Sequence, residues 1–184
     1  MNLLEMILNS QNGGAVRQLA QNFGLEQNQA ASAISNLVPA LSSGLMRNVS
    51  QAGGLESLLS ALGGGQHARY LDDLSTLGRP ETVEDGNGIL GHILGSKDVS
   101  RQVARAASRQ SGIGEDVLKK MLPVVAGMVM GALSKQSTSL GAARQQRSAG
   151  GSDLLGTFAS FLDANRDGSI ADDVLGIVGK LFQK

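Results

Sequence analysis

Short apolar segments with helical spacing, separated by glycine clusters, constrain the fold of this chain more than any other feature. Apolar residues recur every three or four positions, as in Leu3, Leu4, Ile7 and Leu8. No run of β-branched residues alternates with polar ones over the length of a strand. The pattern predicts an all-α protein. The glycine clusters that divide it stand at residues 13–14, 53–54, 63–65, 86–88 and 150–151.

The composition narrows the classes of chemistry open to the chain. Aromatic residues make up only 3% of the sequence, so few rings are present to stack on nucleic acid bases. The chain has no Cys, which excludes disulfides, thiol catalysis and thiolate metal sites. Its formal net charge is zero, and this balance disfavours bulk binding to nucleic acid.

Two polar stretches suggest how the chain is divided. Residues 78–88 combine a proline, three acids and three glycines, and they predict an exposed loop. Residues 135–151 have little apolar content, and they predict a flexible linker. We therefore expect an all-helical domain over residues 1–134 and a separate helix-loop-helix tail over residues 152–184.

The predicted domain contains a weak internal repeat. Residues 17–20 (RQLA) resemble residues 101–104 (RQVA), and each set precedes a glycine, at Gly24 and Gly112. This arrangement predicts two related units in one core, each resembling a helix-turn-helix or homeodomain. DNA-binding proteins of this shape need basic side chains at the start of the second helix. Acids stand there instead, at Glu26, Glu115 and Asp116, so a packing unit is the better interpretation.

The tail carries the most specific motif. Residues 163–170 match the first eight positions of an EF-hand calcium loop, with oxygen-bearing side chains at positions 1, 3 and 5 and Gly168 at position 6. Position 12, which needs a bidentate Glu, is Val174, so one of the two preceding acids would have to close the site. The affinity would be weak, on the order of 10⁻⁴ to 10⁻³ M. The predicted Ca²⁺ ligands are Asp163, Asn165, Asp167, Ser169, Asp172 and Asp173.

Helix capping is the competing interpretation of this motif. Ser169 and Asp172 have the spacing of a capping box, and Asp-Gly is a common turn. Capping does not account for the three oxygen-bearing residues at 163, 165 and 167, so we favour the calcium loop.

Three arginines, Arg101, Arg105 and Arg109, line one face of a predicted helix. One interpretation is a contact with phosphate, which makes a weak DNA-binding protein the alternative function. The other is a solvated face, neutralised by the acidic residues of the predicted loop at Glu81, Glu84 and Asp85. We favour the solvated face.

The remaining candidate residues do not match any active-site motif. His67 and His92 have no ligand partners at metal-binding spacing, and no Ser lies in a nucleophile elbow. Gly127 and Gly131 predict close helix packing, either within the core or between protomers. The apolar run of residues 121–133 is too short to cross a bilayer, and the first residues predict a helix and no signal peptide. We therefore expect a cytoplasmic protein without a membrane span.

Several of these segments together resemble a known family. Residues 91–95 (GHILG), 101–104, 111–113 (SGI) and 121–126 (MLPVVA) are similar to the bacterial YidB-like family, a domain of unknown function with a homeodomain-like helical fold. The resemblance covers about residues 1–134. The ending of the tail, with Asp172 and Asp173, also resembles the acidic tail of many members. The resemblance supports the all-α class and implies no catalytic residues.

Together these patterns predict a non-enzymatic helical interaction module. Its partner would be another protein or a second copy of the chain, and its tail would bind calcium.

Overall fold

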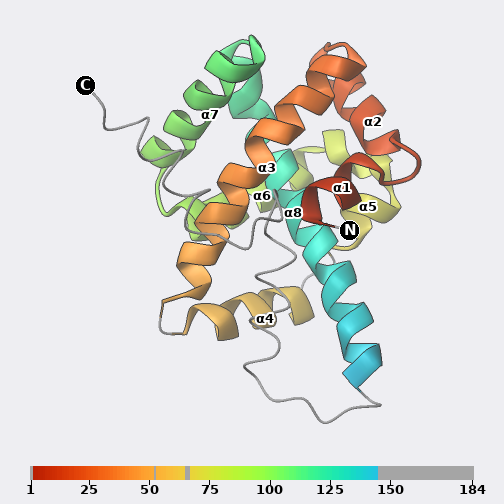
Figure 1. The fold of residues 1–184 in the computed structure, drawn as a ribbon, viewed down its shortest axis with the longest axis vertical. Coiled ribbons are helices and arrows are strands. Elements are labelled where there is room, and N and C mark those ends of the chain that lie inside the picture. Colours follow the sequence, from red (N-terminus) through yellow and green to blue (C-terminus); the bar gives the residue numbers. More distant parts are fainter. Residues whose placement is uncertain (1, 52, 65–66, 145–184) are drawn as a thin grey trace.

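The computed structural model of the chain describes residues 2–51, 53–64 and 67–144. Over these ranges the protein is all-α and contains no strand, which confirms the predicted class (Figure 1). A 3₁₀ helix, η1 (Leu74–Gly78), lies between α5 and α6. The α-helices are α1 (Leu3–Leu8), α2 (Gly14–Phe23), α3 (Gln27–Val49), α4 (Gly54–Gly64), α5 (Arg69–Asp72), α6 (Pro80–Leu94), α7 (Lys97–Ser111) and α8 (Glu115–Arg144).

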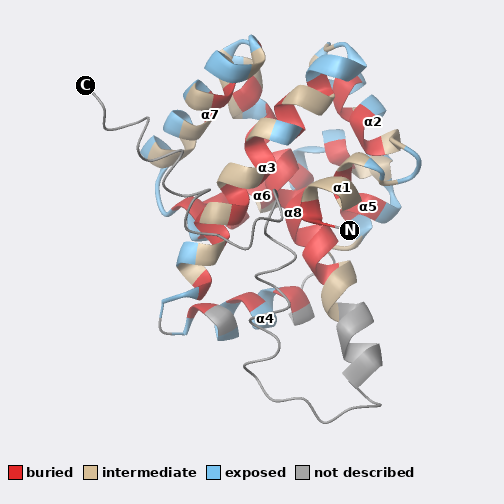
Figure 2. Cartoon of the chain, in the orientation of Figure 1, coloured by how far each residue is buried: buried red, intermediate tan, exposed pale blue. Residues whose placement is uncertain are grey.

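The fold is built around α8, which contacts α1, α2, α3, α4, α5, α6 and α7. Every residue from Met121 to Ser134 is buried, and Figure 2 shows this part of α8 buried behind the other helices. A helix that is apolar on all sides must be covered on all sides to be stable in water. The longest apolar run in the sequence therefore forms the centre of the core.

The length of α8 bears on the question of a membrane span. Among the described residues, one helix, over Glu115–Ser137, is long and apolar enough to cross a bilayer by length and composition alone. In its most apolar window, 83% is buried inside the fold, as in the core helix of a water-soluble domain.

The prediction of a loop over residues 78–88 is wrong, because helix α6 begins at Pro80 and continues to Leu94. Pro80 occupies the first turn, where its missing N–H costs nothing, and Glu81 favours the positive end of the helix. Gly86 faces the backbone of α8, and a Cβ at this position would overlap the Pro123 carbonyl oxygen. Tertiary packing therefore outweighs the low helix propensity of the glycines.

The segment predicted to be a linker is partly helical. Helix α8 continues past residue 135 and ends at Arg144, because extending an existing helix adds one hydrogen bond for each residue fixed. Residues 145–184 lie outside the described residues, and with them the predicted EF-hand-like tail. The division into domain, linker and tail stays a prediction.

The two members of the internal repeat have the same local structure. Gly24 caps the end of α2 and is followed by α3, while Gly112 caps the end of α7 and is followed by α8. Both glycines adopt the left-handed conformation, with φ of 63° and 72°, which is favourable for glycine at a helix end. The prolines of the repeat, Pro39 and Pro123, lie inside α3 and α8. The helix-turn-helix shape of these pairs stays a prediction.

Candidate functional site

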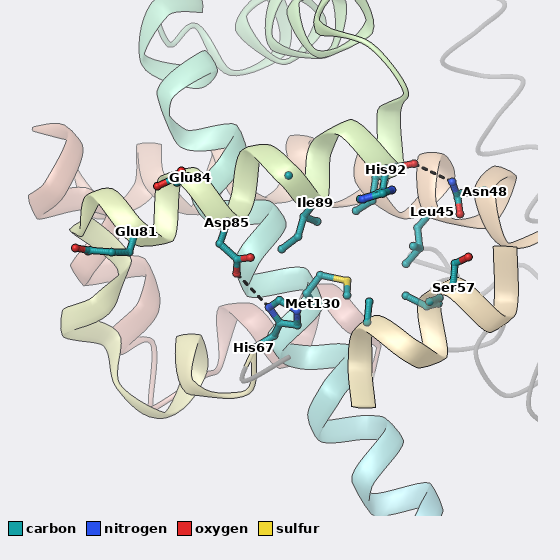
Figure 3. A pocket seen from close by; sticks show the side chains of 14 residues that line it. Leu45, Asn48, Ser57, His67, Glu81, Glu84, Asp85, Ile89, His92 and Met130 are labelled. Atoms are coloured by element: carbon teal, nitrogen blue, oxygen red, sulfur yellow. Dashed lines mark hydrogen bonds and ion pairs between the residues drawn. The ribbon is translucent and has the colours of Figure 1, made fainter. Parts of the chain in front are cut away.

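A pocket of about 600 Å³ lies between α3, α4, α6 and α8 (Figure 3). This volume is within the range of sites that hold a small molecule or a few side chains of a partner. Its apolar lining comes from all four helices: Leu45 from α3, Leu58 and Ala61 from α4, Ile89 and Ile93 from α6, and Met130 from α8. The polar lining is Asn48, Ser57, His67, Glu81, Glu84, Asp85 and His92.

The predicted small-residue motif of α8 lies outside the pocket lining and packs against α5 and the residues before it. A Cβ on Gly127 would lie 3.3 Å from the Tyr70 ring, and a Cβ on Gly131 would lie 2.7 Å from the His67 carbonyl oxygen. The motif therefore serves close packing within the core, one of the two interpretations left open by the sequence. It allows α5 and the residues before it to approach α8, and so brings His67 and Tyr70 beside the pocket.

Asp85 is the centre of a partly buried polar cluster at the pocket wall. Its Oδ2 accepts a hydrogen bond of 2.5 Å from the Tyr70 hydroxyl and lies 3.2 Å from His67 Nδ1. Figure 3 shows His67 and Asp85 pointing toward each other across this wall. Three segments distant in the sequence are joined here, since His67 precedes α5, Tyr70 lies in α5, and Asp85 lies in α6.

Burial and the neighbouring Arg69 and Asp85 together set the pKa of Tyr70. Burial raises the pKa of the Tyr70 phenol; the hydrogen bond from Arg69 opposes the rise, and Asp85 adds to it. Tyr70 therefore remains a hydrogen-bond donor at neutral pH. The Arg69 guanidinium donates to the Tyr70 hydroxyl over 3.2 Å and lies 5.1 Å from the centre of its ring.

The opposite end of the pocket is held by bonds to backbone oxygens. Asn48 Nδ2 donates to the His92 carbonyl oxygen over 2.8 Å, which ties α3 to the end of α6 (Figure 3). The Ser57 hydroxyl donates to the carbonyl oxygen of Gly53, the residue before α4, over 2.8 Å. Asn48 thus holds two walls of the pocket together, while Ser57 forms a local bond at the start of α4.

Comparison with known proteins places this pocket within a family domain. The family profile described as "Bacterial protein of unknown function (DUF937)" matches residues 5–136. The chain belongs to this family. All the residues that line the pocket lie within the DUF937 match. No curated protein and no solved structure matches the chain.

The match to DUF937 confirms the coarser part of the sequence interpretation. A bacterial domain of unknown function was expected over about residues 1–134, and the match covers nearly the same range. The YidB-like name and the homeodomain-like shape stay predictions.

Two of the three arginines on the arginine face of the DUF937 domain are paired, but with other acids than those predicted. Arg101 Nη1 lies 2.8 Å from Asp98 Oδ1, and Arg105 Nε lies 3.3 Å from Glu115 Oε2. The hydrogen bond from Lys119, with a second from Arg105, lowers the pKa of Glu115. Glu81, Glu84 and Asp85 lie at the pocket instead, so their predicted role beside the arginines is wrong.

The predicted calcium ligands, Asp163 to Asp173, all lie outside the described residues. Over residues 2–51, 53–64 and 67–144, no group of three or more His, Asp or Glu side chains is placed to hold a metal ion.

The pocket itself was missed by sequence reasoning. The sequence offered no metal-ligand partner for His67 or His92, and both line the pocket. A signal was present in the spacing of α6: residues 81, 84, 85, 88, 89 and 92 follow helical periodicity and all face the pocket. Interpreting residues 78–88 as a loop concealed this pattern.

Proposed function

We propose that the DUF937 domain is a non-enzymatic helical interaction module, and that the pocket between α3, α4, α6 and α8 receives apolar side chains of a protein partner. The observation that carries this proposal is the pocket itself. It combines a volume of about 600 Å³ with apolar side chains from four helices. Burying such surface is the main favourable term in most protein association.

The polar groups of the pocket favour binding over catalysis. A nucleophile needs a base within hydrogen-bond reach. The Ser57 hydroxyl donates to a backbone carbonyl, and His67 is paired with Asp85. Both groups are therefore engaged in ways that fit a structural role.

Two glycines on α6 allow a matched test of this proposal. Gly88 lines the pocket and Gly91 does not, yet a Cβ added at either would meet no atom within 4 Å. Leucine fits a helix better than glycine, so both Gly88→Leu and Gly91→Leu should fold. Only Gly88→Leu places a side chain in the pocket.

The probe is a fluorescent helical peptide with leucines along one face and glutamines elsewhere. Binding to the full chain is measured by fluorescence anisotropy. Loss of one apolar contact corresponds to about a tenfold change in Kd, so Gly88→Leu should weaken binding by about tenfold or more. Gly91→Leu should bind like the wild type. Equal affinities for the two variants, or no binding to the wild type, would contradict the proposal.

The tail adds a second proposal, which the sequence alone supports. We propose that Asp163, Asn165 and Asp167, with Ser169 and a closing carboxylate from Asp172 or Asp173, bind one Ca²⁺. Calorimetric titration of Ca²⁺ into the full chain should release or absorb heat, and Asp163→Ala should abolish the signal. Titrations without heat for both the wild type and Asp163→Ala would contradict the proposed calcium site.

We further propose that the module acts in the cytoplasm with α8 as a core helix. The burial of most of its apolar window supports this role.

A further inference from the structure

We infer that the partner received by the pocket is a basic amphipathic helix, with apolar residues that enter between α4 and α6 and Lys or Arg residues that lie against Glu81 and Glu84. This inference rests on the proposed function and adds the chemistry of the occupant.

The charges around the pocket have one sign. Of the described residues that line it, three are carboxylates, Glu81, Glu84 and Asp85, and none is Lys or Arg. Asp85 is already engaged by Tyr70 and His67. Glu81 and Glu84 are exposed, and neither forms a salt bridge with any side chain in the described part of the chain. Two carboxylates are therefore open to a cationic partner.

The hydrogen bond to Tyr70 raises the pKa of the Arg69 guanidinium. Asp85 and Glu81 attract the same group and add to the rise, but three carboxylates against this one guanidinium leave a net negative charge. Arg69 lies beside the cluster, but its guanidinium donates to the Tyr70 hydroxyl and stacks on the Tyr70 ring. The residual field at this end of the pocket favours positive charge on a ligand.

The position of the acids sets where the partner's bases must lie. Glu81 and Glu84 are in the first turns of α6, and the apolar residues Ile89 and Ile93 follow toward its other end. Figure 3 shows the two glutamates at the end of the pocket opposite Asn48 and His92. A partner would therefore need bases one to two turns from its apolar anchors.

A helical partner fits this site better than an extended one. The walls of the pocket are helices, whose backbone groups bond within their own segments, and the described elements offer no strand edge for pairing. The partner must then satisfy its own backbone hydrogen bonds, which a helix does. Four helices around an apolar cavity have the geometry of helix-in-groove recognition.

Three peptides of equal length and identical leucine face test the inference. Their flanking positions carry Lys, Gln or Glu, and their Kd for the full chain is measured at low and high salt. The Lys peptide should bind most tightly and the Glu peptide most weakly. The advantage of Lys over Gln should shrink between about 0.05 M and about 0.5 M salt, because salt screens exposed charges.

A double variant tests whether Glu81 and Glu84 are the carboxylates that attract the Lys peptide. Glu81→Gln combined with Glu84→Gln should weaken the Lys peptide by roughly fivefold, the scale of two exposed ion pairs, and leave the Gln peptide unchanged. Asp116→Asn is the matched control, since its side chain is 91% exposed and lies on α8 outside the pocket lining. It should change neither affinity.

The outcomes separate the two proposals. Equal affinities for all three peptides, with Gly88→Leu still blocking them, would overturn the inference and leave the proposed function standing. Binding of the Lys peptide that ignores Gly88→Leu would show attraction outside the pocket, and would overturn the inference. If none of the peptides binds, both fall.

Discussion

At the scale of single residues, glycine has two different roles on one helix. Gly86 lies against the backbone of α8, where a Cβ would overlap the Pro123 carbonyl oxygen. Gly88 and Gly91 face open space, with no atom within 4 Å of a Cβ. The first glycine allows two helices to cross closely, and the other two lower helix propensity without packing against anything.

Alanine substitutions should therefore differ in sign along α6. Gly86→Ala should lower the free energy of unfolding by about 2 kcal/mol, the scale of overpacking in a core. Gly88→Ala and Gly91→Ala should each raise it by about 0.5–1 kcal/mol through helix propensity. Urea unfolding of the three variants measures this. Similar effects for all three would show that α6 and α8 do not cross at Gly86.

Tyr70 provides a second prediction at this scale, because it is the one tyrosine in the sequence and its absorbance titrates alone. Burial raises the pKa of its phenol above the ordinary value of about 10. The folded state then holds the proton more tightly than the unfolded state. Its stabilising contribution is fully present below about pH 10 and is lost as pH rises through the folded pKa.

The measurement compares the wild type with Tyr70→Phe. The wild type should lose stability above about pH 10 relative to the variant, and its tyrosinate absorbance should rise at higher pH than that of the unfolded chain. A phenol that titrates like the unfolded chain would contradict the burial of Tyr70 beside Asp85.

At the scale of elements, the sequence predicted helices best where the buried residues are apolar and recur with helical spacing. The apolar spacing predicted a helix at residues 3–8, and α1 covers these residues. The prediction of a loop over residues 78–88 failed because glycine and threonine make the buried contacts of this segment. Thr82 is buried, and its hydroxyl donates to the Thr76 carbonyl oxygen. In a single sequence, small residues at a close helix crossing cannot be distinguished from the small residues of a loop.

The elements should also differ in how readily they open. The core segment of α8 is buried throughout, whereas the buried apolar side chains described in α4 are Leu58 and Leu62. Hydrogen exchange monitored by mass spectrometry should therefore show the slowest amides in residues 121–134 and faster exchange over Gly54–Gly64. Equal protection of the two segments would show that α4 is a fixed wall of the pocket.

At the scale of the whole molecule, the fold class followed from the sequence but the candidate site did not. The pocket depends on α3, α4, α6 and α8 meeting in space, and Leu45 and Met130 are far apart in the chain. No local pattern encodes such a meeting. The predicted calcium loop is the opposite case, since its ligands are close in sequence and a motif is enough to propose it.

The central claim is that the pocket between α3, α4, α6 and α8 is the surface that a partner occupies. Methyl NMR tests it directly, because Met130 lines the pocket while Met121 is fully buried in α8 outside its lining. With ¹³C-methyl methionine and the Lys-flanked peptide, the Met130 signal should shift on titration and the Met121 signal should stay in place. A Met130 signal that does not move while the peptide binds would contradict the account.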